Sequence, residues 1–261
     1  MYKIAISPEE IESLPLTSFT GEITVVGGIG KNFWKAIEYL KKQKMLGFDT
    51  ETKPSFDNRS KHNGVALLQL SGEDKAYLFR VQKIALMRLV YRLLANPEII
   101  KVGAACGDDI RGLQRYAKFD GRSFVDLQRI VGDYGIRDKS VKKMAAIILG
   151  IRISKTQQLS NWEAEELSEA QKRYAATDAW VCREMYLKLL QSEKHPLTAE
   201  ERIPPQQLEQ QRQAAERRAA RRAEQEEQER RRRNNRNRRR RQRRRRKKQL
   251  TDGSQTISEK G

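Results

Sequence analysis

The stretch MLGFDTE (45–51) decides how this chain is interpreted, because it joins an apolar segment to two carboxylates. Its first half is typical of a buried strand, and its second half places Asp49 and Glu51 one residue apart. Side chains alternate along a strand, so both carboxylates are expected on one face of a sheet. Alone, such a pair of acids more often lies at the solvent-exposed end of a strand than in a binding site. The rest of the sequence is needed to distinguish the two.

The segments around this stretch predict an α/β domain with a mixed β-sheet flanked by helices. Five short apolar segments are expected to be strands, at 23–28, 45–51, 65–71, 75–81 and 99–105. Helical spacing is found at 33–43, 84–94, 140–149 and 167–190. The order does not fit an all-parallel nucleotide-binding fold, and GGIGKN (27–32) lacks the spacing of a phosphate-binding loop.

Composition divides the chain into a globular part, 1–195, and a tail, 196–261. The formal net charge is +19, and +12 of it falls in the tail, which holds 22 Lys and Arg against 10 Asp and Glu. Apolar residues make up 38% of the whole chain, and only 11 of them lie in the tail. The first part therefore has the composition of one folded domain, whereas the tail cannot build a core of its own.

Several classes of protein are disfavoured by the composition. No apolar run approaches the length of a membrane span, and MYKIAISPEE (1–10) lacks the features of a secretory signal. Cys106 and Cys182 are the only cysteines, and neither has a second Cys or a His at metal-ligand spacing. We therefore expect reduced thiols, no zinc site and a cytoplasmic location, or another reducing compartment rich in nucleic acid.

Further acids follow apolar segments at two other places. Asp108 and Asp109 open a predicted helix, and Asp178 lies four residues after Tyr174, so both project from one helix face. Singly, an Asp at a helix start is more often a cap, and the Tyr–Asp pair could be half-exposed. Clustered buried carboxylates repel one another, and a pair of divalent cations such as Mg²⁺ would stabilise them.

Three motifs together resemble those of the DEDDy 3′–5′ exonucleases, as found in ribonuclease D and Werner-type exonuclease domains. They are LGFDTE (46–51), VGAACGDDIRGL (102–113) and SNWEAEELSEAQKRYAATDAW (160–180). The resemblance covers about 30–192 and implies a ribonuclease H-like fold. GAACG replaces the usual lead-in of the second motif, a departure that touches no ligand position.

The resemblance also implies roles for individual residues. Two divalent cations, Mg²⁺ or Mn²⁺, would be held by four carboxylates: Asp49, Glu51, Asp109 and Asp178. Asp49 would bridge both ions, and Tyr174 would orient the attacking water. Asp109 is preferred to Asp108 as the metal ligand, because the apolar helix residues Ile110 and Leu113 follow Asp109 at the spacing of the family pattern. No organic cofactor is expected.

Three candidate substrate contacts lie outside the acids. Lys155 matches a basic position that precedes the third motif in relatives, where it would contact the scissile phosphate, or it is a solvated loop lysine. Phe56 and His62, in the loop after the first motif, are candidates to contact a terminal base. Trp162 and Trp180 are interpreted as packing residues.

The tail carries a strongly basic segment. Residues 230–248 hold 15 Arg or Lys among 19, the others being Asn and Gln, and 206–229 could be a solvated helix or disordered. Arginine donates paired hydrogen bonds to phosphate, so we predict a salt-sensitive nucleic-acid tether; the alternative is a solubilising tail. The tether arginines are Arg230, Arg231, Arg232, Arg233, Arg238, Arg239, Arg240, Arg241, Arg243, Arg244, Arg245 and Arg246.

The sequence thus predicts a metal-dependent 3′–5′ exonuclease that acts on single-stranded 3′ ends and releases nucleoside monophosphates. Because Arg-rich arms often fold on structured RNA, RNA or a ribonucleoprotein is slightly favoured over DNA as partner. No membrane partner is expected. The alternative is a catalytically weak nucleic-acid or ribonucleoprotein-binding adaptor built on an exonuclease fold, which the presence of every expected acid disfavours.

Overall fold

The structure, a computed structural model, describes residues 1–54, 63–84 and 88–255. The chain divides into two compact units, Met1–Arg202 and Ile203–Gly261. The boundary inferred from composition, after His195, is earlier than this one. Leu197 explains the difference, because its side chain is buried and its N–H donates to the carbonyl of Gly132 at 2.9 Å. The segment after His195 therefore still belongs to the first unit.

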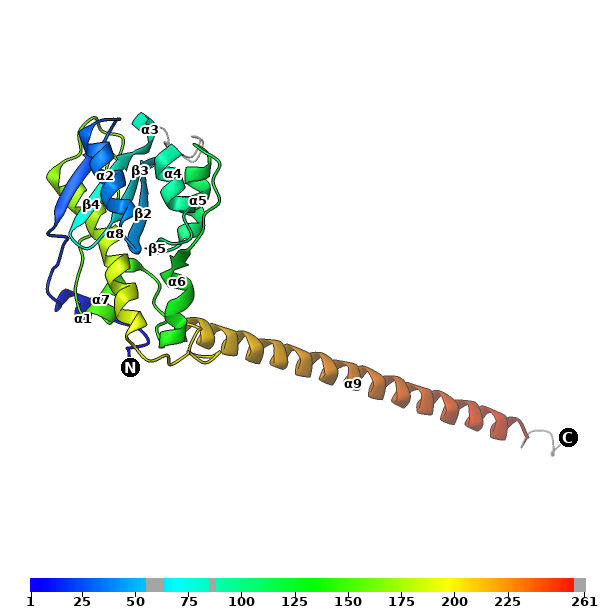
Figure 1. Cartoon of the computed structure of the whole chain (residues 1–261). Coiled ribbons are helices and arrows are strands. Elements are labelled where there is room, and N and C mark those ends of the chain that lie inside the picture. The colour runs from blue at the N-terminus through cyan, green and yellow to red at the C-terminus, as the bar shows by residue number, and fades with distance from the viewer. Residues whose placement is uncertain (55–62, 85–87, 256–261) are drawn as a thin grey trace. The chain divides into compact units, whose positions relative to one another are not determined.

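A six-stranded mixed sheet forms the centre of the first unit (Figure 1). The strands are β1 (Glu22–Val26), β2 (Met45–Thr52), β3 (Val65–Ser71), β4 (Lys75–Arg80), β5 (Ile100–Gly103) and β6 (Phe124–Asp126). Their order is β1-β4-β3-β2-β5-β6, with β3 antiparallel to both β2 and β4 and the other pairs parallel. The predicted α/β class with a mixed sheet is confirmed.

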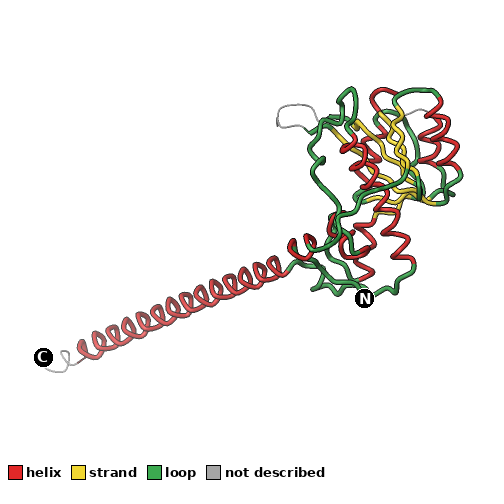
Figure 2. The backbone as a smooth tube through the Cα atoms, turned by 90° about the vertical axis from the view of Figure 1, so that its left-hand side faces the viewer, coloured by secondary structure: helices red, strands yellow, loops and turns green. Residues whose placement is uncertain are grey.

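Helices cover both faces of this sheet (Figure 2). They are α1 (Pro8–Glu12), α2 (Lys31–Lys41), α3 (Val81–Ile84), α4 (Arg88–Ala95), α5 (Cys106–Gln114), α6 (Leu127–Ile130), the 3₁₀ helix η1 (Val131–Tyr134), α7 (Val141–Leu149) and α8 (Glu169–Leu190). Apolar side chains of α2, α4 and α5 pack on one face, and α8 crosses the other face together with α7. The long predicted helix, α8, thus forms the second layer.

Local signals explain where the helices begin and end. Ser140 caps the start of α7, and Gly150 ends it in the left-handed region, at φ 67°. Ser168 and Gln171 form a capping box at the start of α8. The short helix α1 was not predicted, because five residues are too few to show helical periodicity, although its Ser7 also forms a capping box.

The described part of the second unit contains one long helix, α9 (Pro205–Gln255). The sequence left open whether the tail is helical or disordered, and the structure describes a helix. The side chains of Arg230, Arg231 and Arg232 are exposed, whereas those of the tether arginines from Arg233 onward lie outside the description. Among the described residues, no helix combines the length and the apolar character that crossing a membrane requires.

Candidate active site

Direct contact between β2 and α8 brings acids from the two elements together. Asp49 and Glu51 point to the α8 side of β2, and so does Gly47. A Cβ atom at Gly47 would lie only 1.8 Å from the carbonyl oxygen of Ala179 on α8. The backbone of α8 therefore rests on β2 with no side chain between them, and Asp178, the residue before Ala179, lies beside Asp49.

Three carboxylates form the centre of the site. One oxygen from each of Asp49, Glu51 and Asp178 lies within 4.8 Å of the other two, and all three side chains are half-buried. Burial, followed by repulsion from Asp178 and the neighbouring acids, raises the pKa of Asp49 well above its ordinary value and that of Glu51 to about 8. Charges this close need a proton or a cation, and an all-oxygen donor set fits Mg²⁺ or Mn²⁺.

Asp109 approaches from the opposite layer. The pairing of β2 with β5 ends at Gly47 and Val102. In the described part of the chain, the rest of β2 has no strand on that side, and α5 lies there instead. Asp109, in the first turn of α5, accepts a hydrogen bond from Thr50 Oγ1 at 2.5 Å. Burial raises its pKa to about 6, and its charge contributes to the raised pKa values of Asp49 and Glu51.

Asp108, the neighbour of Asp109, points away from the acids. Its side chain is 85% exposed and pairs with Arg111 one turn further along α5. The structure thus separates two adjacent acids that the sequence distinguished only by resemblance: Asp109 is half-buried against Thr50, and Asp108 is exposed to solvent. Among the described residues, neither belongs to the group of three acids that could share one ion.

Tyr174 lies one helical turn before Asp178 and is almost completely buried. Burial, followed by the charges of Asp178, Glu51 and Asp49, raises the pKa of its phenol. The ring packs on the buried Trp162, with centroids 5.9 Å apart. Trp162 is therefore a packing residue, as expected, and the side chain that it packs against is Tyr174.

Arg80 holds the loop that carries Trp162. This nearly buried arginine, at the end of β4, donates to the carbonyl of Ala164 at 2.5 Å and to that of Glu165 at 3.2 Å. Sequence reasoning missed Arg80, Thr50 and Gly47. Arg80 lies inside the apolar segment KAYLFRV (75–81), whose other basic residue is the first, Lys75. A basic residue within an otherwise apolar strand was the available signal.

The predicted substrate contacts have different outcomes. Burial raises the pKa of Asp178 to about 6, and the ammonium of the exposed Lys155 counteracts part of this rise. Phe56 and His62 lie outside the described residues. Trp180 packs against Phe19, with ring centroids 6.0 Å apart, in agreement with a packing role.

Both cysteines are buried free thiols, Cys106 on α5 and Cys182 on α8. Burial raises the pKa of each, and the acids of the site contribute in the same direction. Neither thiol belongs to the group of possible metal ligands found among the described residues.

Comparison with known proteins agrees with this geometry. The 3′–5′ exonuclease family model matches residues 31–192. The exonuclease mut-7 homolog of Aedes aegypti is 28% identical over 179 residues, covering 59% of this chain and 24% of that protein. Ribonuclease D of Gluconacetobacter diazotrophicus is 27% identical over 157 residues, covering 59% of this chain and 39% of that protein. The chain thus spans less than half the length of these curated relatives.

A solved structure shows the same fold. The EXO domain of Nibbler from Aedes aegypti superposes with a TM-score of 0.58 at 23% identity, covering 67% of this chain and 91% of that one. The predicted ribonuclease H-like fold is thereby confirmed. Because the family match spans β2, α5 and α8, the elements that hold the acids, this chain belongs to the 3′–5′ exonuclease family.

Proposed function

We propose that this chain is a metal-dependent 3′–5′ exonuclease that removes the terminal nucleotide from a single-stranded 3′ end. One observation supports it above the others: acids from β2 and α8, far apart in the sequence, converge within 4.8 Å. Asp49, Glu51 and Asp178, with Asp109 beside them, would hold two divalent cations. When bound, such ions stabilise charge on the attacking and leaving oxygens.

The chain itself positions the reactants. The raised pKa of Tyr174 keeps its hydroxyl protonated at neutral pH, so it orients the attacking water by hydrogen bonding and does not remove its proton. Lys155, exposed next to Asp178, would contact the scissile phosphate. Water adds its oxygen to phosphorus, the bond to the 3′ oxygen breaks, and that oxygen takes up a proton. The products are a nucleoside monophosphate and a shortened strand.

The direct test uses oligonucleotides labelled at the 5′ end or at the 3′ end, with Mg²⁺ or Mn²⁺ and with EDTA. We expect stepwise shortening from the 3′ end that EDTA abolishes. Asp49→Asn and Asp178→Asn should lose activity, whereas Asp120→Asn, which changes an exposed acid of the same type, should keep it. Full activity in Asp178→Asn would remove this mechanism. Binding without any cleavage would instead favour the adaptor alternative.

We also propose that RNA is the preferred substrate and that α9 tethers it. One relative is a ribonuclease by name, and the arginines of α9 whose side chains are described are exposed to solvent. A flexible or extended basic segment raises the local concentration of nucleic acid near the site without taking part in the chemistry. Parallel assays on single-stranded RNA, single-stranded DNA and recessed duplexes test the preference.

A cytoplasmic location is the compartment that we propose, since two buried free thiols suit a reducing environment. Imaging of the tagged protein in living cells tests it. Accumulation of the protein in an oxidising compartment would contradict the proposal.

A further inference from the structure

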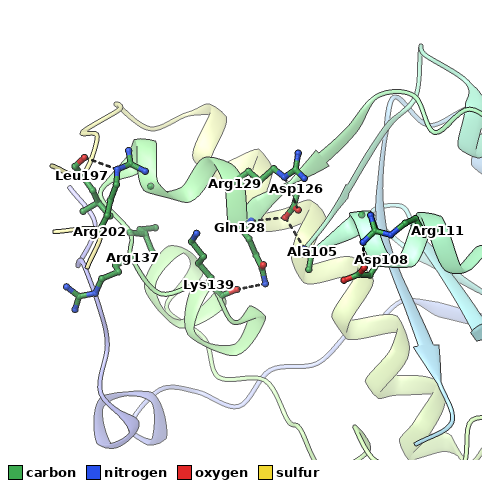
Figure 3. Close-up of a pocket in the computed structure, with 13 residues that line it drawn as sticks. Ala105, Asp108, Arg111, Asp126, Gln128, Arg129, Arg137, Lys139, Leu197 and Arg202 are labelled. Carbon is green, nitrogen blue, oxygen red and sulfur yellow. Dashed lines mark hydrogen bonds and ion pairs between the residues drawn. The ribbon is translucent and has the colours of Figure 1, made fainter. Parts of the chain in front are cut away.

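A basic cavity lies next to the acids in the first unit. Its volume is about 540 Å³, and buried Ile136 and Leu197 form part of its wall. Five cationic side chains line it, against the two carboxylates of Asp108 and Asp126: Arg111, Arg129, Arg137, Lys139 and Arg202. Figure 3 shows Arg111 and Asp108 at one side of the cavity, Arg137 and Arg202 at the other, and Asp126 between them.

The positive charge is neutralised at one side only. Arg111 pairs with Asp108, and Arg129 lies 3.7 Å from a carboxylate oxygen of Asp126. Asp126 itself is held by backbone N–H groups, those of Ala105 at 2.9 Å and Gln128 at 3.0 Å. These two arginines are therefore already engaged with acids.

The other side carries the excess charge. Arg137 donates to the carbonyl of Glu201, and Arg202 to that of Leu197, each at 3.3 Å. Carbonyl acceptors orient a guanidinium but leave its charge unneutralised. Within the described part of the chain, Arg137, Lys139 and Arg202 form no ion pair with a carboxylate.

Gly132 contributes to the shape of this side. A Cβ atom at Gly132 would lie 3.0 Å from a terminal nitrogen of Arg202, so the glycine allows the guanidinium to lie close to η1. Two arginines held by carbonyls, together with a lysine that no carboxylate pairs with among the described residues, surround an apolar wall and form a site suited to an anion. Phosphate is the anion that such arginine and lysine clusters recognise in nucleic acid.

The cavity is also close to the proposed catalytic acids. Gly107 and Asp108, which line it, directly precede Asp109 on α5. Asp126, at its centre, contributes to the raised pKa of Asp109. In a 3′–5′ exonuclease only one nucleotide lies beyond the scissile bond, so any second phosphate near the acids belongs to the 5′ side of the strand.

We infer that this cavity binds one phosphate of the nucleic-acid strand on the 5′ side of the scissile phosphodiester, through Arg137, Lys139 and Arg202. The inference rests on the proposed exonuclease function and adds a contact that fixes the register of the strand. Because the site is separate from the reacting phosphate, it contributes to substrate binding, and its loss raises KM and leaves kcat unchanged.

The test neutralises single phosphates. A series of hexanucleotides carries one uncharged methylphosphonate at each internal position in turn, and KM is measured with the full chain in Mg²⁺. In the wild type, a methylphosphonate at one of these positions should raise KM about tenfold, as expected for a lost charge-assisted contact. In Arg137→Ala/Lys139→Ala, KM for the unmodified strand should already be raised, and the same methylphosphonate should add nothing. Hydrolysis of a dinucleotide should be unchanged.

The matched control is Lys31→Ala/Lys41→Ala, which removes the same charge from exposed positions on α2. The inference is wrong if the control variant raises KM as much as the cavity variant does. It is also wrong if each methylphosphonate raises KM by the same factor in the cavity variant as in the wild type. It is also wrong if inorganic phosphate or a nucleoside monophosphate binds the cavity but no strand phosphate couples to it. If the wild type cleaves nothing, anisotropy binding of the same strands in Ca²⁺ tests the cavity separately from the proposed function.

Discussion

The carbonyl oxygen of Ala179 occupies the space that a side chain at Gly47 would need, 1.8 Å from the position of its Cβ. This contact between two backbones sets how closely α8 approaches β2. Asp178 directly precedes Ala179, and Asp49 lies two residues after Gly47 on the same face of β2. The spacing of the Asp49 and Asp178 carboxylates therefore depends on this contact.

Gly47→Ala should destabilise the protein by about 1–3 kcal/mol, because the added methyl group meets backbone atoms that cannot rotate away. It should also lower kcat, since α8 must shift and take Asp178 with it. Chemical denaturation and steady-state kinetics measure the two effects. Gly28→Ala is the control, because nothing lies within 4 Å of a Cβ there. Equal stability of both variants would contradict the role of the contact.

Tyr174→Phe should lower kcat about 100-fold, because the hydroxyl that orients the attacking water is lost. The affinity for Mn²⁺, measured by calorimetry, should change little, since the four acids remain. Tyr134→Phe, at another buried tyrosine in η1, is the matched control and should keep full activity. A variant that loses Mn²⁺ binding together with activity would assign Tyr174 to the metal site.

The acid cluster should make stability depend on pH. Glu51 has a pKa of about 8 in the fold, against 4.5 for the ordinary side chain, so the unfolded chain releases this proton first. Stability of the metal-free protein should therefore fall as the pH rises from about 4.5 to about 8. Mg²⁺ binds the ionised form, so it should raise Tm more at pH 8 than at pH 5.

Thermal unfolding across this pH range, with EDTA or with Mg²⁺, measures the effect. In Glu51→Gln the fall in Tm between pH 4.5 and pH 8 should be smaller, because one titrating group is gone. If the curves of Glu51→Gln and wild type run parallel, the pKa of Glu51 is not raised in the folded protein.

Arg80→Ala should loosen the loop that carries Trp162, because the carbonyls of Ala164 and Glu165 lose a charged donor. A loss of about 2 kcal/mol is expected for hydrogen bonds of this kind. Hydrogen exchange of the backbone amides in 160–167 should become faster. The value of kcat should also fall, because Trp162 packs against Tyr174 and a looser loop holds Tyr174 less firmly. Lys83→Ala is the control, since this exposed lysine donates to the same Glu165 carbonyl at 3.4 Å. Similar exchange in both variants would show that Arg80 does not anchor the loop.

Truncation after Arg202 should weaken binding to long RNA and reduce its dependence on salt, while hydrolysis of a dinucleotide stays at the wild-type level. Fluorescence anisotropy at several salt concentrations measures the first effect. Truncation after His195 should in addition lower Tm, because the buried Leu197 and the contacts of Arg202 are lost. Unchanged affinity for long RNA would contradict the tether.

Local pattern was enough to predict much of this protein. The alternation in 45–51 placed Asp49 and Glu51 on one face of a strand, and the four-residue spacing placed Tyr174 and Asp178 on one face of a helix. Both follow from backbone geometry alone. The resemblance of three motifs then indicated which acids belong together, and the family match agrees with it.

Other features depended on contacts between distant residues, which no local pattern encodes. The outward orientation of Asp108, the Thr50 hydroxyl against Asp109 and the packing of Trp162 on Tyr174 each need two elements to be placed relative to each other. The same holds for the basic cavity, whose cations come from 111 to 202 in the sequence. Spacing along the chain fixes which side chains share an element, whereas only the packing of elements brings separate carboxylates and cations within reach of one another.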